Sequence, residues 1–424
     1  MEIVHLGIAT GTGDKPPFPG YAVRVNMGRK LRVGVVGGGI GGLALAATLT
    51  KCRIESHLFE RAPAFGEVGA GLQMTPNAVK VIRELGVSDQ LRKVSFLPQS
   101  IVGRNWHTGK VTFRTPLIDD CPRLYGAEFF HTHRADLHRI LLSLVPSNSA
   151  TLSARCVSVS QTKQTAVAVF ADGSEFEADL IVGADGIQST VRMSLFGTEA
   201  PRFTGNMCWR MLIPFEKADF ELVSPDASFW LGPKGHVVTY YVSAGRAVNV
   251  VAIREADAWV EESWNIRSSR EELLAGYPHW HPNVLNLFRK AENIFKWGLF
   301  DRDPMATWSS RRITLLGDAA HPMLPFLSQG AAMAIEDGYV LGAVLAKNSD
   351  PAVALKKYEG LRLPRTRRVQ LESRKRGETY HISSPLKRLY RDTLYRVRQM
   401  VNPQTTGIQA NWIYSYDAIS EPLR

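Results

Sequence analysis

The sequence predicts an α/β protein in which one parallel sheet is assembled from distant segments, with a β-rich insert and a helical C-terminal tail. Short apolar strands that run directly into Gly-containing loops begin near residues 31, 180 and 313. Residues 203–257 are rich in Val, Tyr, Trp and Phe and alternate with a period of two, which is typical of a separate sheet. The tail is helical in pattern and basic. This order places the β-rich insert between the last two strands of the parallel sheet.

The first unit, residues 31–50 (LRVGVVGGGIGGLALAATLT), is long and apolar enough to cross a bilayer. Its internal order argues against a membrane span. A β-branched run is followed by five Gly within six residues and then by an Ala/Leu-rich stretch. Strand, tight turn and helix are therefore predicted, and a strand over 54–59 completes a β-α-β unit. We expect no membrane span.

The remaining elements follow from periodicity and turn chemistry. We expect a helix within 76–93 that ends near Gly86, helices over 134–145 and 269–290, a helix from the third Gly loop to about residue 346, and strands over 155–170 that end in a hairpin turn at 171–174. The predicted segments are the α/β domain at 29–100, its continuation with some strands of the second sheet at 101–202, the β-sheet domain at 203–298, the last α/β segment at 299–360 and a basic helical region at 361–424.

Composition sets the broad class of the protein. Of the 424 residues, 45% are hydrophobic and 21% are charged, so a full core is available and disorder is not the default. The four cysteines form no C-x-x-C pair and no signal peptide is visible, which favours reduced thiols and a cytoplasmic location. Residues 1–28 contain several Gly and Pro and predict a loose leader.

Basic residues gather in the tail. The net charge is +11, and residues 362–398 hold 12 Lys or Arg against three acidic residues. A nucleic-acid or membrane face is one interpretation. A solvated helical tail is the other, and we favour it because aromatic residues do not alternate with the charges as in single-strand binders. We therefore expect no nucleic-acid partner, although a positive field also attracts anionic substrates and dinucleotides.

The glycines of the first unit have the spacing G-x-G-x-x-G. Gly37 permits a tight turn, Gly39 lets the backbone approach a pyrophosphate, and Gly42 lets helix and strand pack closely. The helix that follows offers free N–H groups to phosphates. Glu60 closes the next strand about 20 residues on, where a carboxylate binds ribose hydroxyls. These residues predict a dinucleotide site, against the alternative of a turn that binds nothing.

Two further loops indicate which dinucleotide is bound. GVVGGGIGG (34–42), IVGADGIQSTVR (181–192) and ITLLGDAAHPMLPFLSQGAAMAIED (313–337) resemble the three fingerprints of the class A FAD-dependent aromatic hydroxylases, the single-component monooxygenases of the para-hydroxybenzoate hydroxylase type. The resemblance implies a Rossmann-like FAD-binding domain with an inserted β-sheet substrate domain. It also implies FAD as cofactor, and NADH or NADPH and O2 as co-substrates.

The resemblance assigns roles to the loops. The first loop would take the FAD pyrophosphate, the Asp185-Gly186 loop would serve FAD and the nicotinamide cofactor, and the Gly317-Asp318 loop would hold the ribityl chain. An Arg ahead of a helix contacts FAD in the family, and Arg134 matches it. The complete set of cofactor residues that we predict is Gly37, Gly39, Ile40, Gly42, Glu60, Arg61, Arg134, Asp185, Gly186, Gly317, Asp318, Pro325, Gly330 and Ala331.

Three other stretches narrow the branch. FGEVGAGLQMTPNA (65–78), WLGPKGHVVTYYV (230–242) and LFDRDPMATW (299–308) resemble the branch of salicylate 1-hydroxylase, 3-hydroxybenzoate 6-hydroxylase and 6-hydroxynicotinate 3-monooxygenase. This resemblance implies that His236 deprotonates a substrate phenol and that Tyr240 shares the site. In a strand the two side chains face the same way, and a neutral imidazole can accept a proton near neutral pH. The alternative is that His236 caps a strand end and Tyr240 belongs to the core.

Arg210 is a lone Arg at the start of an apolar strand, where buried Arg usually needs a partner. The matching Arg of the family lies near flavin and substrate; an interdomain ion pair is the alternative. Gln73 stands where the nicotinate branch tends to have His, and Phe326 where polar residues often follow the Pro, so a more apolar ring is favoured. The predicted substrate pocket consists of Gln73, Trp209, Met323, Leu324 and Phe326.

These expectations describe hydroxylation of a phenolic aromatic acid of the hydroxybenzoate, salicylate or 6-hydroxynicotinate type, by way of a flavin C4a-hydroperoxide. CO2 would leave where the attacked carbon bears a carboxylate. A flavin epoxidase or dearomatising hydroxylase of a larger metabolite is the alternative, and a flavin-binding redox sensor is a distant one. His131, His133 and His138 lack an i, i+4 pair, so no metal is expected. We expect a small aromatic substrate as partner and a monomer or homodimer.

Overall fold

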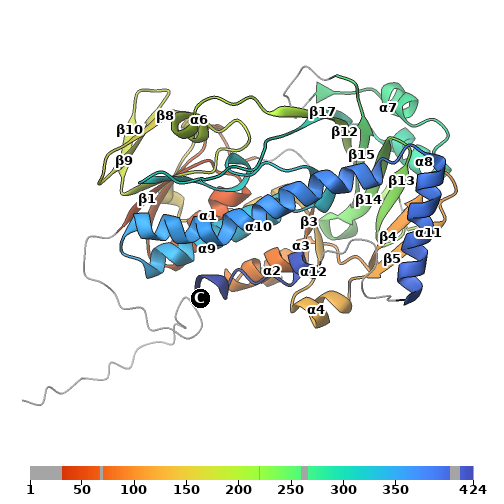
Figure 1. Cartoon of the computed structure of the whole chain (residues 1–424), viewed down its shortest axis with the longest axis horizontal. Helices are drawn as coiled ribbons and strands as arrows, with labels where there is room; N and C mark the ends of the chain where they lie inside the picture. The colour runs from red at the N-terminus through yellow and green to blue at the C-terminus, as the bar shows by residue number, and fades with distance from the viewer. Residues whose placement is uncertain (1–30, 67–69, 219, 259–265, 402–410, 424) are drawn as a thin grey trace, which may run out of the picture.

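The computed structural model describes residues 31–66, 70–218, 220–258, 266–401 and 411–423. The expected leader at 1–28 and part of the 65–78 stretch lie outside the described residues. Two sheets occupy opposite ends of an elongated molecule, and the long helix α10 (Pro351–Tyr380) runs along both of them (Figure 1).

The first sheet is parallel and has the strand order β18-β11-β1-β2-β7. Its central strand β1 pairs with β11 on one side and with β2 on the other. Val33, Val35 and Val36 of β1 are buried, which explains the uninterrupted apolar run in the sequence. The five strands are β1 (Arg32–Val36), β2 (Glu55–Phe59), β7 (Ala150–Thr151), β11 (Leu180–Gly183) and β18 (Ile313–Leu315). The expected assembly from distant segments is confirmed.

The second sheet has eight strands in the order β16-β17-β12-β15-β14-β13-β4-β5. Neighbours pair antiparallel except β13 and β4, which are parallel. Its strands are β4 (Ser100–Asn105), β5 (Val111–Pro116), β12 (Arg202–Pro214), β13 (Ala227–Gly232), β14 (Gly235–Val242), β15 (Ala247–Glu255), β16 (Ile266–Arg267) and β17 (Phe295–Asp301). The period of two seen in the sequence reflects two buried faces: one packs on α7 (Arg270–Gly276) and α8 (Pro282–Lys290), and the other faces the parallel-sheet half.

Helices cover the parallel sheet. α1 (Ile40–Lys51) packs against α9 (Gly330–Lys347), where Gly338 and Gly342 lie so close to α1 that an added Cβ would meet it at 2.6 Å. The expected helix in this region ends at Glu84, close to Gly86, where the chain turns with φ +84° before a second short helix begins. The other helices are α2 (Pro76–Glu84), α3 (Ser88–Val94), α4 (Asp120–Tyr125), α5 (Arg134–Leu142), α6 (Thr190–Phe196), α11 (Pro385–Val401) and α12 (Asn411–Tyr414).

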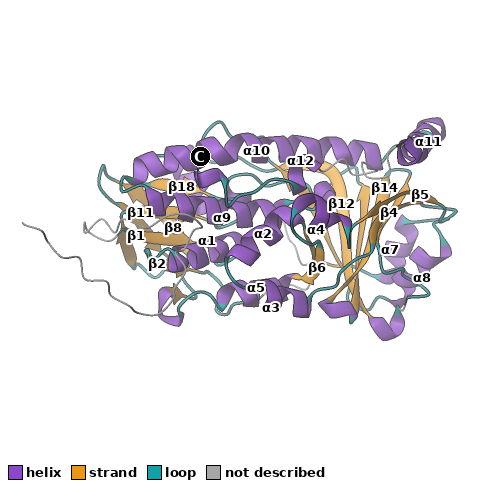
Figure 2. Ribbon diagram, turned by 90° about the horizontal axis from the view of Figure 1, so that it is seen from below, coloured by secondary structure: helices purple, strands orange, loops and turns teal. Residues whose placement is uncertain are grey.

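Two small sheets complete the described chain. β8 (Cys156–Gln161), β9 (Ala166–Phe170) and β10 (Glu175–Ala178) form the expected antiparallel hairpins, and β3 (Gly71–Met74) pairs with β6 (Phe130–His133) between the two large sheets (Figure 2). Among the described helices, none combines the length and apolar character that crossing a membrane requires.

Helix α10 continues straight through the predicted segment boundary at 360/361. Its buried basic residues are paired: Arg362 contacts Glu336 and Asp337, and Arg365 contacts Glu336. The domain boundaries themselves stay a prediction. Part of the positive charge of the tail is thus neutralised inside the fold, so the expectation of a solvated tail does not hold for Arg362 and Arg365.

Candidate active site

The first Gly loop is built as the G-x-G-x-x-G spacing requires. Gly37 has φ +113°, and a Cβ there would meet the backbone of Ala184 at 2.3 Å. A Cβ on Gly42 would meet the carbonyl oxygen of Gly37 at 2.0 Å, so helix and turn are in direct backbone contact. A Cβ on Gly39 would meet nothing within 4 Å. Gly39 therefore faces open space directly before α1, where a phosphate could approach free N–H groups.

Side chains from two other elements hold this loop. The Glu60 carboxylate, at the end of β2, accepts hydrogen bonds from the Gly38 N–H (2.7 Å) and the Ala62 N–H (2.8 Å). The His138 ring on α5 lies 2.8 Å from the Gly38 carbonyl oxygen. Glu60 thus rigidifies the turn as well as presenting a carboxylate at the expected place, while Arg61 is exposed beside it.

Hydrogen bonds to Asp185 fix the shape of the second loop. The Ser189 hydroxyl donates to Asp185 (2.5 Å), and the Val191 N–H at the start of α6 donates to the other carboxylate oxygen (3.2 Å). Gly186 has φ +79°, and a Cβ there would meet nothing within 4 Å. Asp185 therefore shapes the loop, and the backbone at Gly186 is the part that faces open space.

The third loop brings a carboxylate into a cavity. Gly317 has φ +59°, and the exposed Asp318 side chain that follows lines the cavity. Desolvation by the surrounding cavity wall raises the pKa of Asp318, and the nearby His321 and Arg134 act in the opposite direction. Gly330, at the start of α9, is also open, since a Cβ there would only touch Met323 at 4.0 Å.

A buried charged cluster fixes this third loop. Asp337 on α9 accepts hydrogen bonds from the Gly317 N–H (3.0 Å) and Arg362 (2.7 Å), and lies 2.5 Å from the His321 ring. These contacts lower the pKa of Asp337 to about 2, because the positive charges of His321 and Arg362 outweigh the opposing effect of burial. The loop that carries Asp318 is therefore tied to α9 and α10.

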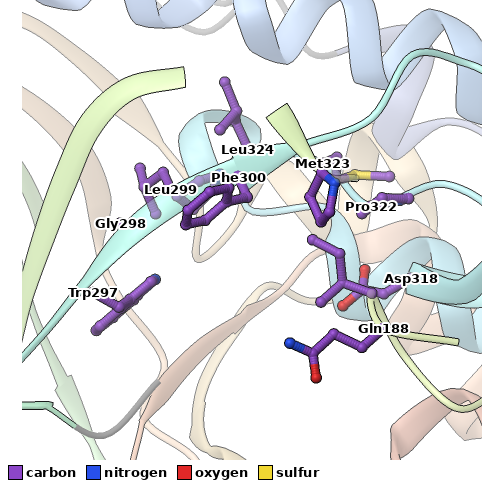
Figure 3. A pocket seen from close by; sticks show the side chains of 12 residues that line it. Gln188, Trp297, Gly298, Leu299, Phe300, Asp318, Pro322, Met323 and Leu324 are labelled. Carbon is purple, nitrogen blue, oxygen red and sulfur yellow. The ribbon is translucent and has the colours of Figure 1, made fainter. Parts of the chain in front are cut away.

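The cavity lies between the third loop and the strand β17 (Figure 3). Asp318 and Gln188 lie at one end in this view, and Trp297 and Leu299 follow the strand at the other. Its wall is mostly apolar, as expected of a site that excludes water. The residues that line it are Ile187, Gln188, Pro201, Trp297, Gly298, Leu299, Phe300, Asp318, Pro322, Met323, Leu324 and Pro325.

Arg210 does not line this cavity but contacts its wall at Trp297. The guanidinium carbon lies 4.9 Å from the centroid of the Trp297 ring, a cation–π contact with a residue of the cavity wall. Its positive charge also acts on the pKa of Tyr240. The structure thus brings Arg210, Tyr240 and the cavity wall into one region.

His236 lies in β14 with a second His against it. Its Nδ1 is 2.8 Å from Nε2 of His381, the residue that caps the C-terminal end of α10. The His236 ring also packs against Phe326 (5.6 Å) and Tyr380 (5.1 Å). Burial, and then the charge of His381, keep the pKa of His236 well below its usual value, so the imidazole is neutral at neutral pH.

Tyr240, two strand positions beyond Val238, lies on the same face of β14 as His236. Burial raises the pKa of its hydroxyl, so Tyr240 is a neutral hydrogen-bond donor at neutral pH. The His131 ring of β6 packs 4.4 Å from the Tyr240 ring, and neither His131 nitrogen has a hydrogen-bond partner among the described residues. Burial lowers the pKa of His131 to about 3.

The predicted substrate pocket is only partly assembled. Met323 and Leu324 line the cavity, whereas Phe326 packs behind it on His236, His381 and Gly377. Gln73 is buried in β3.

Trp209 does not reach the cavity. Residues of β12 alternate between the two faces of the eight-stranded sheet, so Cys208 faces the parallel-sheet half while Trp209 faces α7 and α8. Its indole N–H donates to Ser268 (2.9 Å), and its ring packs on Tyr277. Counting the alternation from Arg210, which faces the site, would have excluded Trp209.

Sequence reasoning missed the contribution of α10. Gln370 donates to the Pro322 carbonyl oxygen (3.1 Å), Ser373 donates to that of Leu324 (2.6 Å), and His381 contacts His236. Buried positions three to four residues apart along 370–381 were the available signal. Among the described residues, no group of three or more His, Cys, Asp or Glu could hold a metal ion.

Comparison with known families agrees with this geometry. Residues 30–373 match the model of the FAD binding domain family, and three quarters or more of the chain aligns with enzymes named as aromatic monooxygenases. The chain belongs to the class A FAD-dependent aromatic hydroxylases. Members of this class use FAD as cofactor and NADH or NADPH and O2 as co-substrates.

Two curated relatives show the extent of the match. The hydroxylase is 39% identical to 3-amino-4-hydroxybenzoate 2-monooxygenase of Streptomyces platensis, over 91% of this chain and 96% of the relative. It is 34% identical to 6-hydroxynicotinate 3-monooxygenase of Bordetella bronchiseptica, over 93% and 97%.

A solved structure has a similar fold. The salicylate hydroxylase substrate complex is similar with a TM-score of 0.78 and 28% identity, over 93% of this chain and 97% of that one. The residues of this hydroxylase fit FAD: Gly39, Gly186 and Gly330 leave open space where a Cβ would stand, and the Asp318 carboxylate lines the cavity. Gly39 and α1 would hold the pyrophosphate, and Asp318 would hold hydroxyls.

Proposed function

We propose that this hydroxylase acts on a single-ring aromatic acid that carries a phenolic hydroxyl, and that 3-amino-4-hydroxybenzoate is the first substrate to test. The observation that carries the proposal is the buried His236 on β14, whose Nδ1 lies 2.8 Å from Nε2 of His381. An imidazole with one nitrogen engaged has one left for a substrate hydroxyl. The names of the relatives at 39% and 40% identity support the substrate class.

His236 acts as the base toward the phenol. Removing the proton makes the ring a better nucleophile, and general-base catalysis of this kind contributes about 10²–10⁴-fold. FAD, when bound, supplies the redox chemistry of the class. The protein side chains orient the ring, hold its charge and exclude water.

Arg210 and Tyr240 bind the anionic and hydroxyl groups of the substrate. Arg210 lies against the cavity wall at Trp297, and its positive charge stabilises a phenolate or a carboxylate. Tyr240, held protonated by burial, donates a hydrogen bond. The apolar wall at Met323 and Leu324 excludes water from the reacting groups.

The test is NADH and NADPH oxidation by the purified holoenzyme with 3-amino-4-hydroxybenzoate, 6-hydroxynicotinate, 3-hydroxybenzoate, salicylate or no aromatic acid. Product, CO2 and H2O2 are followed together. Hydroxylated product from one of the acids supports the proposal, and CO2 distinguishes attack at a carboxylated carbon. Oxidation that yields H2O2 with every acid, or no stimulated oxidation at all, contradicts it.

The four cysteines are free thiols, which agrees with the reducing compartment where NAD(P)H is available. We therefore place the enzyme in the cytoplasm, as a monomer or homodimer. Fractionation of the producing cells and the mass of the native protein test these two points.

A further inference from the structure

The C-terminal end of α10 supplies a second His to the base. Nε2 of His381 lies 2.8 Å from Nδ1 of His236, and the two ring centroids are 5.0 Å apart. Both residues are buried, with exposed fractions of 5% and 2%. The backbone carbonyl of His381 also accepts a hydrogen bond from the Lys234 N–H (3.2 Å), at the turn that leads into β14. This end of α10 is thus fixed on the strand that carries the base.

We propose that His381 is a positioning residue that holds His236 in the one tautomer able to take a proton from the substrate. The proposal rests on the proposed function, since it concerns the same base. A neutral imidazole carries its hydrogen on one nitrogen and a lone pair on the other. His236 can accept a substrate proton at Nε2 only if its hydrogen is on Nδ1, and Nε2 of His381 is placed to accept that hydrogen. His381 must then carry its own hydrogen on Nδ1.

A His partner affects the pKa of His236 differently from a carboxylate partner. A carboxylate hydrogen-bonded to an imidazole stabilises its protonated form and raises its pKa. Burial instead lowers the pKa of His381 to about 4, so the partner is neutral and orients His236 without adding negative charge. His236 therefore stays deprotonated, and ready to accept a proton, over the whole neutral range.

The surroundings of the pair keep it in place. Phe326 packs on both rings (5.6 Å to each), and Tyr380 lies 5.1 Å from His236. Tyr380 is the titratable group that α10 adds beside the pair, and from α11 Arg391 binds the carbonyl oxygens of Thr379 and Tyr380. On β14 itself, Tyr240 shares the face of His236 and burial keeps it protonated.

The same face of α10 holds the cavity wall. Ser373 and Gln370 bind the carbonyl oxygens of the 322–324 stretch, and a Cβ on Gly377 would meet the Phe326 ring at 2.5 Å. The position of His381 relative to the cavity is therefore set by one rigid element, whose course along both sheets is visible in Figure 1. This arrangement is what a positioning role requires.

The test compares His381→Ala, His381→Gln and the control Glu378→Gln, which alters an exposed side chain of the same helix. A Gln amide oxygen can accept the hydrogen of His236 Nδ1, whereas Ala cannot. We expect H381A to lower kcat by about 10²-fold, in the range of general-base catalysis, with a much smaller change in KM. H381Q should restore most of kcat, and E378Q should match the parent enzyme.

Two further readouts separate positioning from a structural role. In H381A the acid limb of the kcat/KM profile should move to higher pH, because loss of the ring admits water and removes the repulsion that lowers the pKa of His236. NMR of nitrogen-15-labelled histidines in the holoenzyme should show His236 with its hydrogen on Nδ1, and a tautomer mixture in H381A.

The outcomes are distinct. Parent-like kcat and pH profile in H381A, or a His236 hydrogen on Nε2 in the parent, would overturn the proposal. The NMR measurement needs no substrate, so it decides the tautomer even if none of the aromatic acids is hydroxylated. If H381A does not fold, a loss of kcat in H381Q equal to that of His236→Asn, which removes the base itself, would overturn the proposal as well.

Discussion

At the residue scale, the glycines of the first loop separate cofactor binding from folding. A methyl group on Gly39 enters open space, whereas on Gly42 it meets the Gly37 carbonyl oxygen at 2.0 Å. We predict that Gly39→Ala folds with parent-like stability but binds FAD at least about tenfold more weakly, a loss of about 1.4 kcal/mol. Gly42→Ala should instead destabilise the fold by about 1–3 kcal/mol through overpacking. Flavin titration of the apoprotein and urea unfolding measure the two effects. Equal FAD affinity in G39A and the parent would contradict the role of Gly39.

The proposed base, His236, can be tested by substitution. His236→Asn removes the proton acceptor and keeps a polar side chain of similar size. Hydroxylation should fall by about 10²–10⁴-fold while flavin content is unchanged, because the FAD loops lie on other elements. Product formed per NADH, with flavin absorbance as the control, measures this. Parent-like product formation would show that another group takes the proton.

His236, Tyr240 and Arg210 could be proposed from the sequence because motif and strand spacing place them together. His381 could not, since it lies 145 residues beyond His236 and its position depends on the length and docking of α10. Trp209 was misplaced although the alternation counted from Arg210 excludes it, since adjacent residues of a strand face opposite sides of the sheet.

At the scale of elements, α10 is the link between the cofactor loop and the cavity wall. Ser373→Ala leaves the buried Leu324 carbonyl oxygen without its 2.6 Å hydrogen bond, which costs about 1–3 kcal/mol. We predict that the looser wall admits water, so that the fraction of NADH oxidation that yields product falls and H2O2 rises. Thr379→Ala, which removes an exposed hydroxyl bonded within the same helix, is the matched control. Equal coupling in the two variants would contradict the role of α10 in the wall.

The charged cluster provides a second test of this element. Asp337→Asn removes the negative charge that binds the Gly317 N–H, the His321 ring and the Arg362 guanidinium, all of which are buried. Breaking a buried pair costs about 3–5 kcal/mol, and FAD affinity should fall because the Asp318 loop loses its anchor. Glu372→Gln, which breaks the exposed pair with Arg368, should cost about 0.3–0.5 kcal/mol. A D337N variant as stable as E372Q would contradict this account.

Strands and most helices were predictable because buried strands and amphipathic helices have clear periods. The continuity of α10 was not, since Pro364 and the density of basic residues made the tail resemble a separate solvated region. Arg362 and Arg365 are in fact the partners of the buried acids on α9.

At the scale of the whole molecule, buried histidines make stability depend on pH. An unfolded His binds a proton below about pH 6.5, but His131 and His381 do so in the folded state only near about 3 and about 4. Between these values the unfolded state binds more protons, so stability falls as pH falls, by up to about 1.4 kcal/mol per pH unit for each His. His131→Leu should reduce this slope in urea unfolding between about pH 6.5 and about pH 4.5. An unchanged slope would show that His131 is protonated in the folded state.

The overall topology could be predicted from three motifs in the right order, because each motif is a strand of the same parallel sheet that leads into a Gly loop. The chemistry of the ring that is hydroxylated is a property of the cavity, which forms between the third loop and β17 and has no local pattern.

The most direct test of the central claim is a single turnover series with 3-amino-4-hydroxybenzoate and isotopically labelled O2 in the parent enzyme and in H236N. We expect that the parent product contains one labelled oxygen atom for each NADH consumed, and that H236N oxidises NADH with little product. If the parent incorporates no label into this acid or into any of the other three, the assigned substrate class is wrong. If H236N incorporates label as fast as the parent, the base is wrong.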